Sequence, residues 1–150
     1  MRAVIVYDSV HGNTEKVARA IAEGLAETSE VVVRKVAEAE TDDLISAELV
    51  IAGSPTHAWN MSRASLEFFQ RISYGAFDGK LAAAFDTRFR GPLTGSAAGR
   101  ISRALQKRGF RLMLRPESFF VAHMQGPLRE GELERARAFG SRLAAEFVRA

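Results

Sequence analysis

Six residues near the amino terminus have the side chains and the spacing to bind a phosphate group. They follow an apolar run and lead directly into a helical pattern: Ser9, Val10, His11, Gly12, Asn13 and Thr14. Hydroxyl groups at both ends, a glycine in the turn and the N–H groups of a helix N-terminus together form an anion site. The segment lacks the lysine of a nucleoside-triphosphate loop and the third glycine of a dinucleotide fingerprint, so we expect a phosphate monoester. The alternative is a capped turn that binds nothing.

Two more polar segments follow apolar runs further along the chain. They come after residues 49–52 and 81–85 and consist of Gly53, Ser54, Pro55, Thr56, His57, Ala58 and Trp59, and of Asp86, Thr87, Arg88 and Phe89. Trp59 is the only tryptophan of the chain. A large aromatic side chain in a polar loop is costly unless something covers it, so Trp59 either packs under its own loop or stacks on a flat ligand.

The sequence predicts neither a metal site nor covalent catalysis. It contains no cysteine, and the three histidines, His11, His57 and His123, do not have the spacing of metal ligands. No nucleophile stands at a recognisable distance from a general base, so we expect no catalytic residues. His123 and Gln125 follow the last predicted strand, where a solvated or capping histidine is the simpler interpretation.

Hydrophobic periodicity predicts strands that alternate with helices. Apolar runs indicate strands at residues 3–7, 31–36, 49–52 and 81–85, and a fifth strand in two pieces at 110–114 and 119–121. The second strand is less uniformly apolar and is expected near an edge. Helical spacing indicates helices at 15–27, from Ser62 to just before Gly75, at about 101–108 and at 131–147, with a short helical turn at 41–43.

Alternating strands and helices of this kind predict an α/β sandwich of three layers. Right-handed crossovers force such strands into a parallel sheet that helices cover on both faces. Ligands bind these sheets outside the carboxyl ends of the strands. The three polar segments follow strands one, three and four, so we expect them to meet at that edge.

Length and composition favour a single domain over residues 1–150, because 150 residues with 47% hydrophobic content can bury one sizeable core. No apolar run approaches the ~20 residues of a membrane span. The start of the chain looks like a strand rather than a signal peptide, and the absence of cysteine gives no sign of an oxidising compartment. We therefore expect a soluble, cytoplasmic protein.

The net charge of +3 hides an asymmetry along the chain. Residues 1–62 hold 5 basic and 10 acidic side chains, whereas residues 63–150 hold 16 and 8. Much of the excess lies between Asp86 and Arg115. This pattern indicates one strongly positive surface, which is either a solvated, arginine-rich face or a site for an anionic ligand or partner.

The first polar segment resembles the phosphate loop of the flavodoxin family, which has the form T/S-x-T/S-G-x-T directly after the first strand. Ser9, Gly12 and Thr14 match it. His11 departs from the pattern, although an imidazole N–H can also donate to a phosphate. The resemblance extends over the whole chain, including the second and third polar segments and the split fifth strand, and it implies a five-stranded parallel sheet in the order 2-1-3-4-5.

The resemblance implies that the cofactor is FMN. Its phosphate would lie in the first loop, and the other two loops would hold the isoalloxazine, with Trp59 on one ring face and Thr56, His57 and Ala58 beside the reactive nitrogen. The family usually has a tyrosine in the third loop, where this chain has Phe89. Either Phe89 covers the second ring face, or an arginine stacks there, or that face is open. The implied cofactor-binding residues are Ser9, Val10, His11, Gly12, Asn13, Thr14, Ser54, Pro55, Thr56, His57, Ala58, Trp59, Asp86, Thr87, Arg88 and Phe89.

The implied function is electron transfer, in which FMN passes one or two electrons to or from a protein partner. Family members are acidic and this chain is basic, so an acidic partner is expected. We expect no membrane and no nucleic-acid contact, and a monomer or weak dimer. The alternatives are a small flavin-dependent quinone reductase and a flavodoxin-like binding module that has lost FMN. A phosphoryl-accepting receiver is excluded, because the third strand ends in Gly53-Ser54 without an aspartate.

Overall fold

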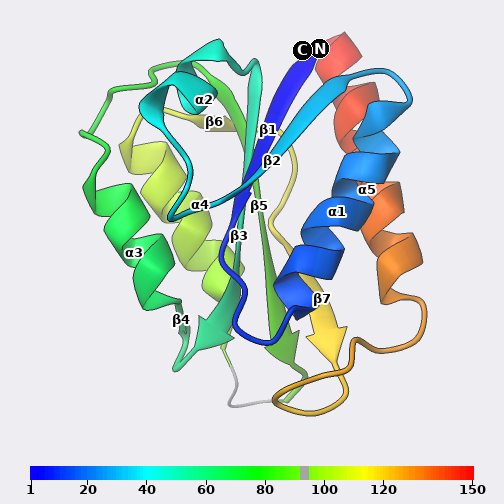
Figure 1. The fold of residues 1–150 in the computed structure, drawn as a ribbon. Helices are drawn as coiled ribbons and strands as arrows, with labels where there is room; N and C mark the ends of the chain where they lie inside the picture. The colour runs from blue at the N-terminus through cyan, green and yellow to red at the C-terminus, as the bar shows by residue number, and fades with distance from the viewer. Residues whose placement is uncertain (92–94) are drawn as a thin grey trace.

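A computed structural model describes residues 1–91 and 95–150 of the chain. A central parallel sheet is covered on one face by α1 and α5 and on the other by α3 and α4 (Figure 1). The elements in chain order are β1 (Arg2–Tyr7), α1 (Asn13–Ala26), β2 (Glu30–Lys35), α2 (Thr41–Ser46), β3 (Leu49–His57), β4 (Asn60–Met61), α3 (Arg63–Gln70), β5 (Leu81–Phe89), α4 (Ala97–Lys107), β6 (Arg111–Leu112), β7 (Glu117–Val121) and α5 (Glu132–Arg149).

The sheet has the predicted strand order. Its strands run β2-β1-β3-β5-β6, and β2 lies at the edge, as predicted. The fifth strand is split, as predicted: β6 pairs with the first residues of β5, and β7 pairs with its last five, from Phe85 to Phe89. β4 is an additional short strand that pairs antiparallel with the end of β3.

Each face of the sheet has its own hydrophobic core, because side chains alternate along every strand. Ile5 and Ile51 point to the core under α1 and α5, whereas Val4, Val50 and Ala82 point to the core on the other face. These side chains are buried almost completely. The strands are therefore apolar on both faces, as expected for a parallel sheet between helices.

Helices α1 and α5 touch at their backbones, which requires glycine on both sides. A Cβ atom on Gly24 would lie 2.1 Å from the carbonyl oxygen of Arg137, and one on Gly140 would lie 2.2 Å from that of Ile21. Gly24 and Gly140 therefore let α1 and α5 pack in direct contact.

Two strands extend further than the sequence predicted. β3 was expected to stop at Gly53 and continues to His57, and Asp86, Thr87 and Arg88, expected in a loop, belong to β5. The prediction was wrong because backbone pairing continues through these residues in spite of their polar side chains, as far as Pro55 opposite Thr87. Gly53 makes room for a ring, since a Cβ there would lie 2.0 Å from the Phe85 side chain.

A tight turn connects β3 to β4. Ala58 and Trp59 form it, and their φ angles are 47° and 73°. Two consecutive positive φ angles are typical of a type I′ hairpin turn, where asparagine and glycine are the usual residues. For alanine and tryptophan this conformation is strained by about 1–3 kcal/mol each. The backbone at this point is therefore held by its surroundings rather than by its own preference.

Candidate functional site

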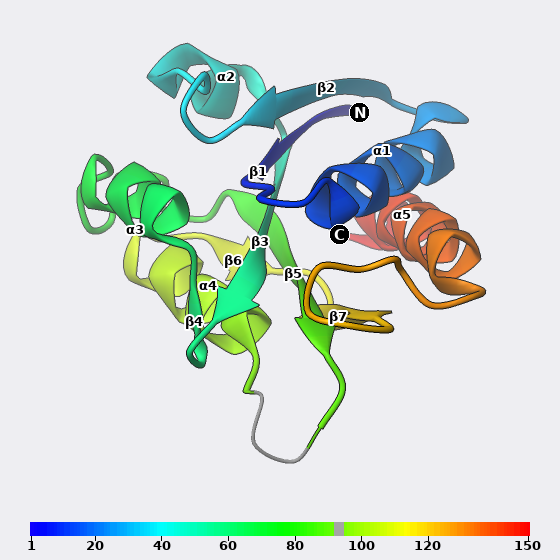
Figure 2. The same cartoon turned by 60° about the horizontal axis from the view of Figure 1, so that its bottom comes forward.

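A cleft of about 290 Å³ opens at the carboxyl ends of β1, β3 and β5. This is the lower edge of the sheet in Figure 1, and Figure 2 shows the loops that surround it. The cleft is lined by residues from four segments of the chain: Val10, His11, Asn13, Thr14, Pro55, Thr56, His57, Thr87, Arg88, Phe89, Val121, Met124 and Gln125. The fold thus brings the three polar segments of the sequence together.

The first loop leads into α1 through Gly12, an N-cap residue that has no side chain to cap the helix. Gly12 precedes the helix with a φ of 87°, a conformation that favours glycine, and a Cβ atom there would meet nothing within 4 Å. The Ser9 hydroxyl accepts a hydrogen bond from the N–H of Glu15 at 3.3 Å. The 14-residue helix therefore begins with open space around Gly12 and with its positive dipole end at the cleft.

Two buried hydroxyl groups meet between the first and third segments. Thr14 Oγ1 and Thr87 Oγ1 lie 2.7 Å apart. Both residues line the cleft, although their accessible surface is small. Each hydroxyl carries one hydrogen, and only one of the two is needed for the hydrogen bond between Thr14 and Thr87. The hydrogen of the other hydroxyl is therefore available to a ligand. This pair links the start of α1 to the end of β5 and supplies a donor at the cleft.

The charge around the cleft suits an anion. None of the described lining residues is an aspartate or a glutamate, while Arg88 is positive and His11 and His57 are potential donors. A phosphate dianion would meet no carboxylate among them. Tyr7 is the last residue of β1, close to the cleft. Burial raises the pKa of its hydroxyl, and the negative charge of Glu15 raises it further, so Tyr7 is neutral at physiological pH.

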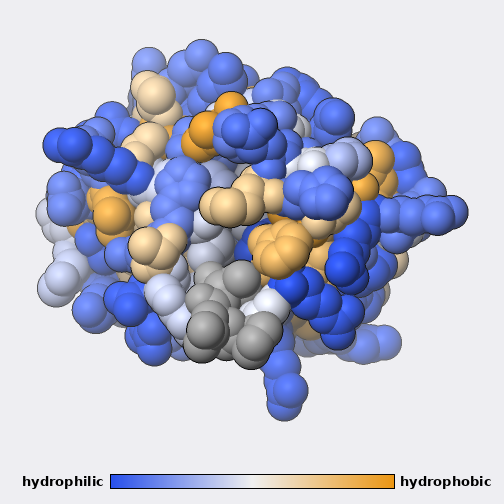
Figure 3. Space-filling view, turned by 90° about the horizontal axis from the view of Figure 1, so that it is seen from below, coloured by the Kyte–Doolittle hydropathy of each residue, from blue (hydrophilic) through white to orange (hydrophobic). Residues whose placement is uncertain are grey.

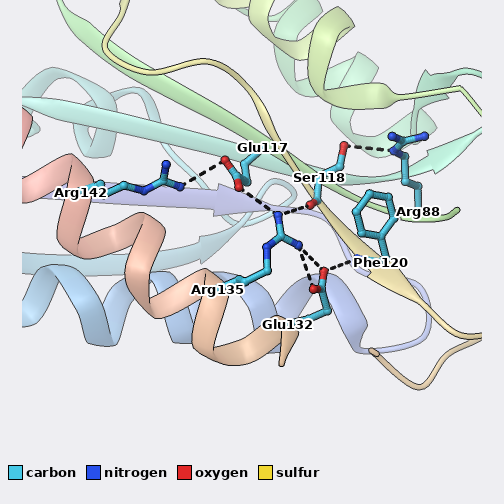
Figure 4. A network of polar contacts seen from close by, with 7 residues as sticks. All are labelled: Arg88, Glu117, Ser118, Phe120, Glu132, Arg135 and Arg142. Carbon is cyan, nitrogen blue, oxygen red and sulfur yellow. Dashed lines mark hydrogen bonds and ion pairs between the residues drawn. The ribbon is translucent and has the colours of Figure 1, made fainter. Parts of the chain in front are cut away.

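Arg88 is held in place by the neighbouring strand. Its Nε donates to the Ser118 hydroxyl at 3.1 Å, one terminal nitrogen donates to the Gly95 carbonyl at 3.1 Å, and its guanidinium lies 5.1 Å from the centre of the Phe120 ring. Figure 4 shows how this contact continues into a network in which Arg135 of α5 bonds Glu117 and Glu132. Arg88 is therefore a fixed positive charge rather than a freely moving one.

The aromatic side chains predicted to cover the flavin lie in different positions relative to the cleft. Phe89 lines it and is 41% exposed. Trp59 is 50% exposed and is not among the described lining residues. Its ring lies against Gly95, where a Cβ atom would come within 2.4 Å of the indole. Trp59 is thus partly packed and partly available to a ligand.

Five other predicted residues lie next to the cleft rather than in its lining. Ser54 is buried, and its hydroxyl accepts from the N–H of Ser62, which fixes the start of α3. Asp86 is buried beside Thr87. The remaining members are Ser9, Gly12 and Ala58, which belong to the two turns.

Three residues of the lining were not predicted to bind a ligand. They are Val121, Met124 and Gln125, from the end of β7 and the loop after it. This loop reaches the first one, because Asn13 Nδ2 donates to the Gln125 carbonyl at 3.1 Å. The sequence could have indicated these residues, because the loop after the fifth strand leaves the sheet at the same edge as the other three segments. Met124, Val10 and Phe89 line the cleft and expose apolar surface. Figure 3 shows hydrophobic patches among polar surroundings on this face of the molecule.

The described part of the chain contains no group of acidic or histidine side chains that could hold a metal ion. Nor does it contain a helix long and apolar enough to cross a membrane.

Comparison with known proteins gives consistent matches. The sequence model of the Flavodoxin domain matches residues 4–86. A flavodoxin of Clostridium saccharobutylicum is 30% identical, with 96% of both chains covered. A flavodoxin of Aquifex aeolicus is 36% identical over 95 residues, which make up 57% of this chain and only 49% of that protein.

Solved structures agree over nearly the full length. A flavodoxin from the domain Archaea has a TM-score of 0.80 and 25% identity, with 97% of this chain and 98% of that chain covered. Oxidised Flavodoxin 1 of Bacillus cereus has a TM-score of 0.79 and 27% identity, with 99% and 98% covered.

Proposed function

The chain belongs to the flavodoxin family of FMN-binding electron-transfer proteins. We propose that it binds FMN in the cleft at the carboxyl ends of β1, β3 and β5. We propose further that the bound FMN exchanges one or two electrons with a protein partner. The main support is that three features meet at one cleft. They are the N-terminus of α1, the hydroxyl pair of Thr14 and Thr87, and a set of described lining residues that includes no aspartate or glutamate. This combination fits a phosphate monoester.

The residues present suit each part of the cofactor. His11, Thr14 and the N-terminus of α1 would hold the phosphate, since they offer N–H and O–H donors and the positive end of a helix dipole. Thr56 and His57 would lie along the ring system, and Phe89 and Trp59 would supply its aromatic neighbours. Bound FMN supplies the redox chemistry, whereas the protein supplies binding, orientation and electrostatics.

The chain's own residues would also control access to the ring. The cleft is open to solvent on one side, where Phe89 is 41% exposed, and the strained turn at Ala58 and Trp59 forms part of its surroundings. Fixed polar groups such as Arg88 stabilise negative charge in the cleft without having to reorient.

The distribution of charge favours an acidic partner. Arginines on α1 and α5 form ion pairs with glutamates, as in Arg19–Glu15 and Arg137–Glu23. On α4, Arg100, Arg103 and Lys107 are exposed and form no ion pair with any described residue. A helix surface with unneutralised positive charge attracts a negatively charged protein surface and speeds its association.

FMN titration of the apoprotein tests the proposal. We expect FMN to bind with a change in its visible absorption bands, and riboflavin, which lacks the phosphate, to bind much more weakly. Equal affinities for the two would contradict the phosphate assignment, and no binding of either would contradict the proposed function. Turnover of reduced pyridine nucleotide with a quinone, without an added reductase, would indicate a reductase in place of a carrier.

A further inference from the structure

Asp86 is a buried acidic side chain directly behind the cleft. Its accessible surface is 0%. It follows Phe85 in β5, stands opposite Ser54 of β3 and Ser118 of β7, and precedes Thr87, which lines the cleft. Burial of a carboxylate is expensive unless hydrogen bonds or cations compensate for the lost water, so its partners indicate what it does.

One carboxylate oxygen of Asp86 connects separate segments. Its Oδ2 accepts hydrogen bonds from the Thr56 hydroxyl at 3.2 Å, the Ser96 hydroxyl at 2.6 Å and the Ala98 N–H at 3.0 Å. Thr56 Oγ1 in turn accepts from the N–H of Ala97 at 3.0 Å. The end of β3 and the start of α4 are therefore fixed to each other through β5.

The other oxygen of Asp86 has no partner among the residues that the structure describes. Its Oδ1 is buried and makes no hydrogen bond with the described residues, and none of their ion pairs includes Asp86. The α4 N-terminus compensates part of the charge through the Ala98 N–H. Clamping α4 and Thr56 needs only hydrogen-bond acceptors, which a neutral amide would also provide, so the unpaired charge is not explained by the clamp alone.

We propose that Asp86 is a positioning residue with two effects on the cofactor site. It fixes Thr56 and the start of α4 around the ring system, and it places an only partly compensated negative charge behind the cleft that lowers the reduction potential of the bound flavin. The second effect rests on the proposed function. Reduction beyond the first electron adds negative charge to the flavin, which a nearby carboxylate opposes. Because this charge is buried, salt screens it only weakly.

The charge is tested with Asp86→Asn, which keeps the shape and one acceptor oxygen. We expect the variant to bind fully reduced FMN about tenfold more tightly, relative to one-electron-reduced FMN, than the unchanged protein does. For one electron this ratio corresponds to a rise of about 59 mV in the second-electron potential. The rise should persist at high salt. Spectroelectrochemical titration measures it, and an unchanged or lower potential would overturn this effect.

Ser96→Ala is the matched control for the charge. It removes one hydrogen bond to the same carboxylate oxygen and leaves the carboxylate itself. We expect its potential to equal that of the unchanged protein. A rise equal to that of Asp86→Asn would mean that loop geometry, and not the charge, sets the potential, and would overturn the proposed role of the charge.

The clamp is tested in the apoprotein, so its outcome does not depend on FMN. In Asp86→Ala, we expect the amide hydrogens of Ala97 and Ala98 to exchange at least tenfold faster than in the unchanged protein. Unchanged exchange would overturn the positioning role. If Asp86→Ala does not fold, Thr56→Val and Thr56→Ser provide the test: exchange at Ala97 should be faster in the first and restored by the hydroxyl of the second. Failure of the unchanged protein to bind FMN would instead count against the proposed function.

Discussion

Thr14 stands where three features meet: the helix N-terminus, the cleft and the Thr87 hydroxyl. Thr14→Ala should weaken FMN binding by about 1.5–3 kcal/mol, or roughly ten- to hundredfold, because it removes a hydrogen bond to a charged acceptor. FMN titration of the apoprotein measures this loss. Thr14→Ser should restore most of the affinity, and riboflavin should bind the alanine variant and the unchanged protein alike. Unchanged FMN affinity in the alanine variant would refute the phosphate assignment.

Trp59 is half-exposed, with Gly95 against its ring. If the flavin stacks on the indole, FMN should quench tryptophan emission, which reports on Trp59 alone because the chain has one tryptophan. Trp59→Ala should weaken binding by about 1–3 kcal/mol if stacking on a flavin resembles stacking on a base, and Trp59→Phe should lose less. Full tryptophan emission at saturating FMN would place the ring away from the flavin.

Arg88 should raise the potential for the second electron, because a fixed cation stabilises negative charge on the reduced cofactor. One positive charge about 8 Å away contributes roughly 0.5–2 kcal/mol at an effective dielectric of 20–80. Arg88→Ala should therefore lower the potential by ~20–90 mV, with the larger shift at low salt. Arg149→Ala removes the same charge at the far end of α5 and should have no effect. A potential that does not fall in Arg88→Ala would mean that this guanidinium serves only the contacts with Ser118, Gly95 and Phe120.

The close contact between α1 and α5 predicts how a substitution at Gly24 changes stability. Gly24→Ala should lower the free energy of unfolding by about 1–3 kcal/mol, since the added methyl group would overlap the carbonyl of Arg137. Gly99→Ala in α4 is the matched control, because a Cβ there meets nothing within 4 Å. It should raise stability by roughly 0.5–1 kcal/mol through helix propensity. Urea unfolding of both variants measures the difference, and a stabilised Gly24→Ala would contradict the close contact.

The sequence predicted the elements well and their ends less well. Apolar runs and helical spacing located the principal strands and helices, because burial in a two-sided core requires those patterns. The extensions of β3 and β5 were missed, since Pro55, Thr56 and Thr87 belong to strands through backbone pairing that hydrophobicity does not reveal. The β3–β4 turn was missed because Ala58 and Trp59 are not typical turn residues.

The candidate site was predictable to the extent that it depends on strand ends. A parallel sheet brings the loops after β1, β3 and β5 to one edge, so residues from all three could be named together. Gln125 and Met124 join the cleft through a contact with Asn13 across more than a hundred residues, which no local pattern indicates. The sequence also could not show which predicted residues line the cleft and which are buried behind it, as Ser54 and Asp86 are, because side-chain packing decides this.

The uneven charge of the protein predicts how it associates with its partner. Electron transfer with an acidic redox protein should slow as ionic strength rises, because salt screens the attraction that speeds encounter. Arg100→Glu with Arg103→Glu should slow it further and reduce this salt dependence. Stopped-flow kinetics measure both effects. Arg137→Glu on α5 is the control and should change the rate less, and equal slowing by both variants would contradict a docking surface on α4.

The contact between α1 and α5 also sets an order of events during synthesis. Glu23 and Arg137 are 114 positions apart, so the helix that begins at the candidate phosphate loop packs against a segment that is synthesised more than a hundred residues later. Until α5 emerges, the sheet covers one side of α1, but the face of α1 that packs against α5 stays exposed. We therefore expect a nascent chain that stops before residue 132 to bind no FMN, and cofactor loading to follow the emergence of α5.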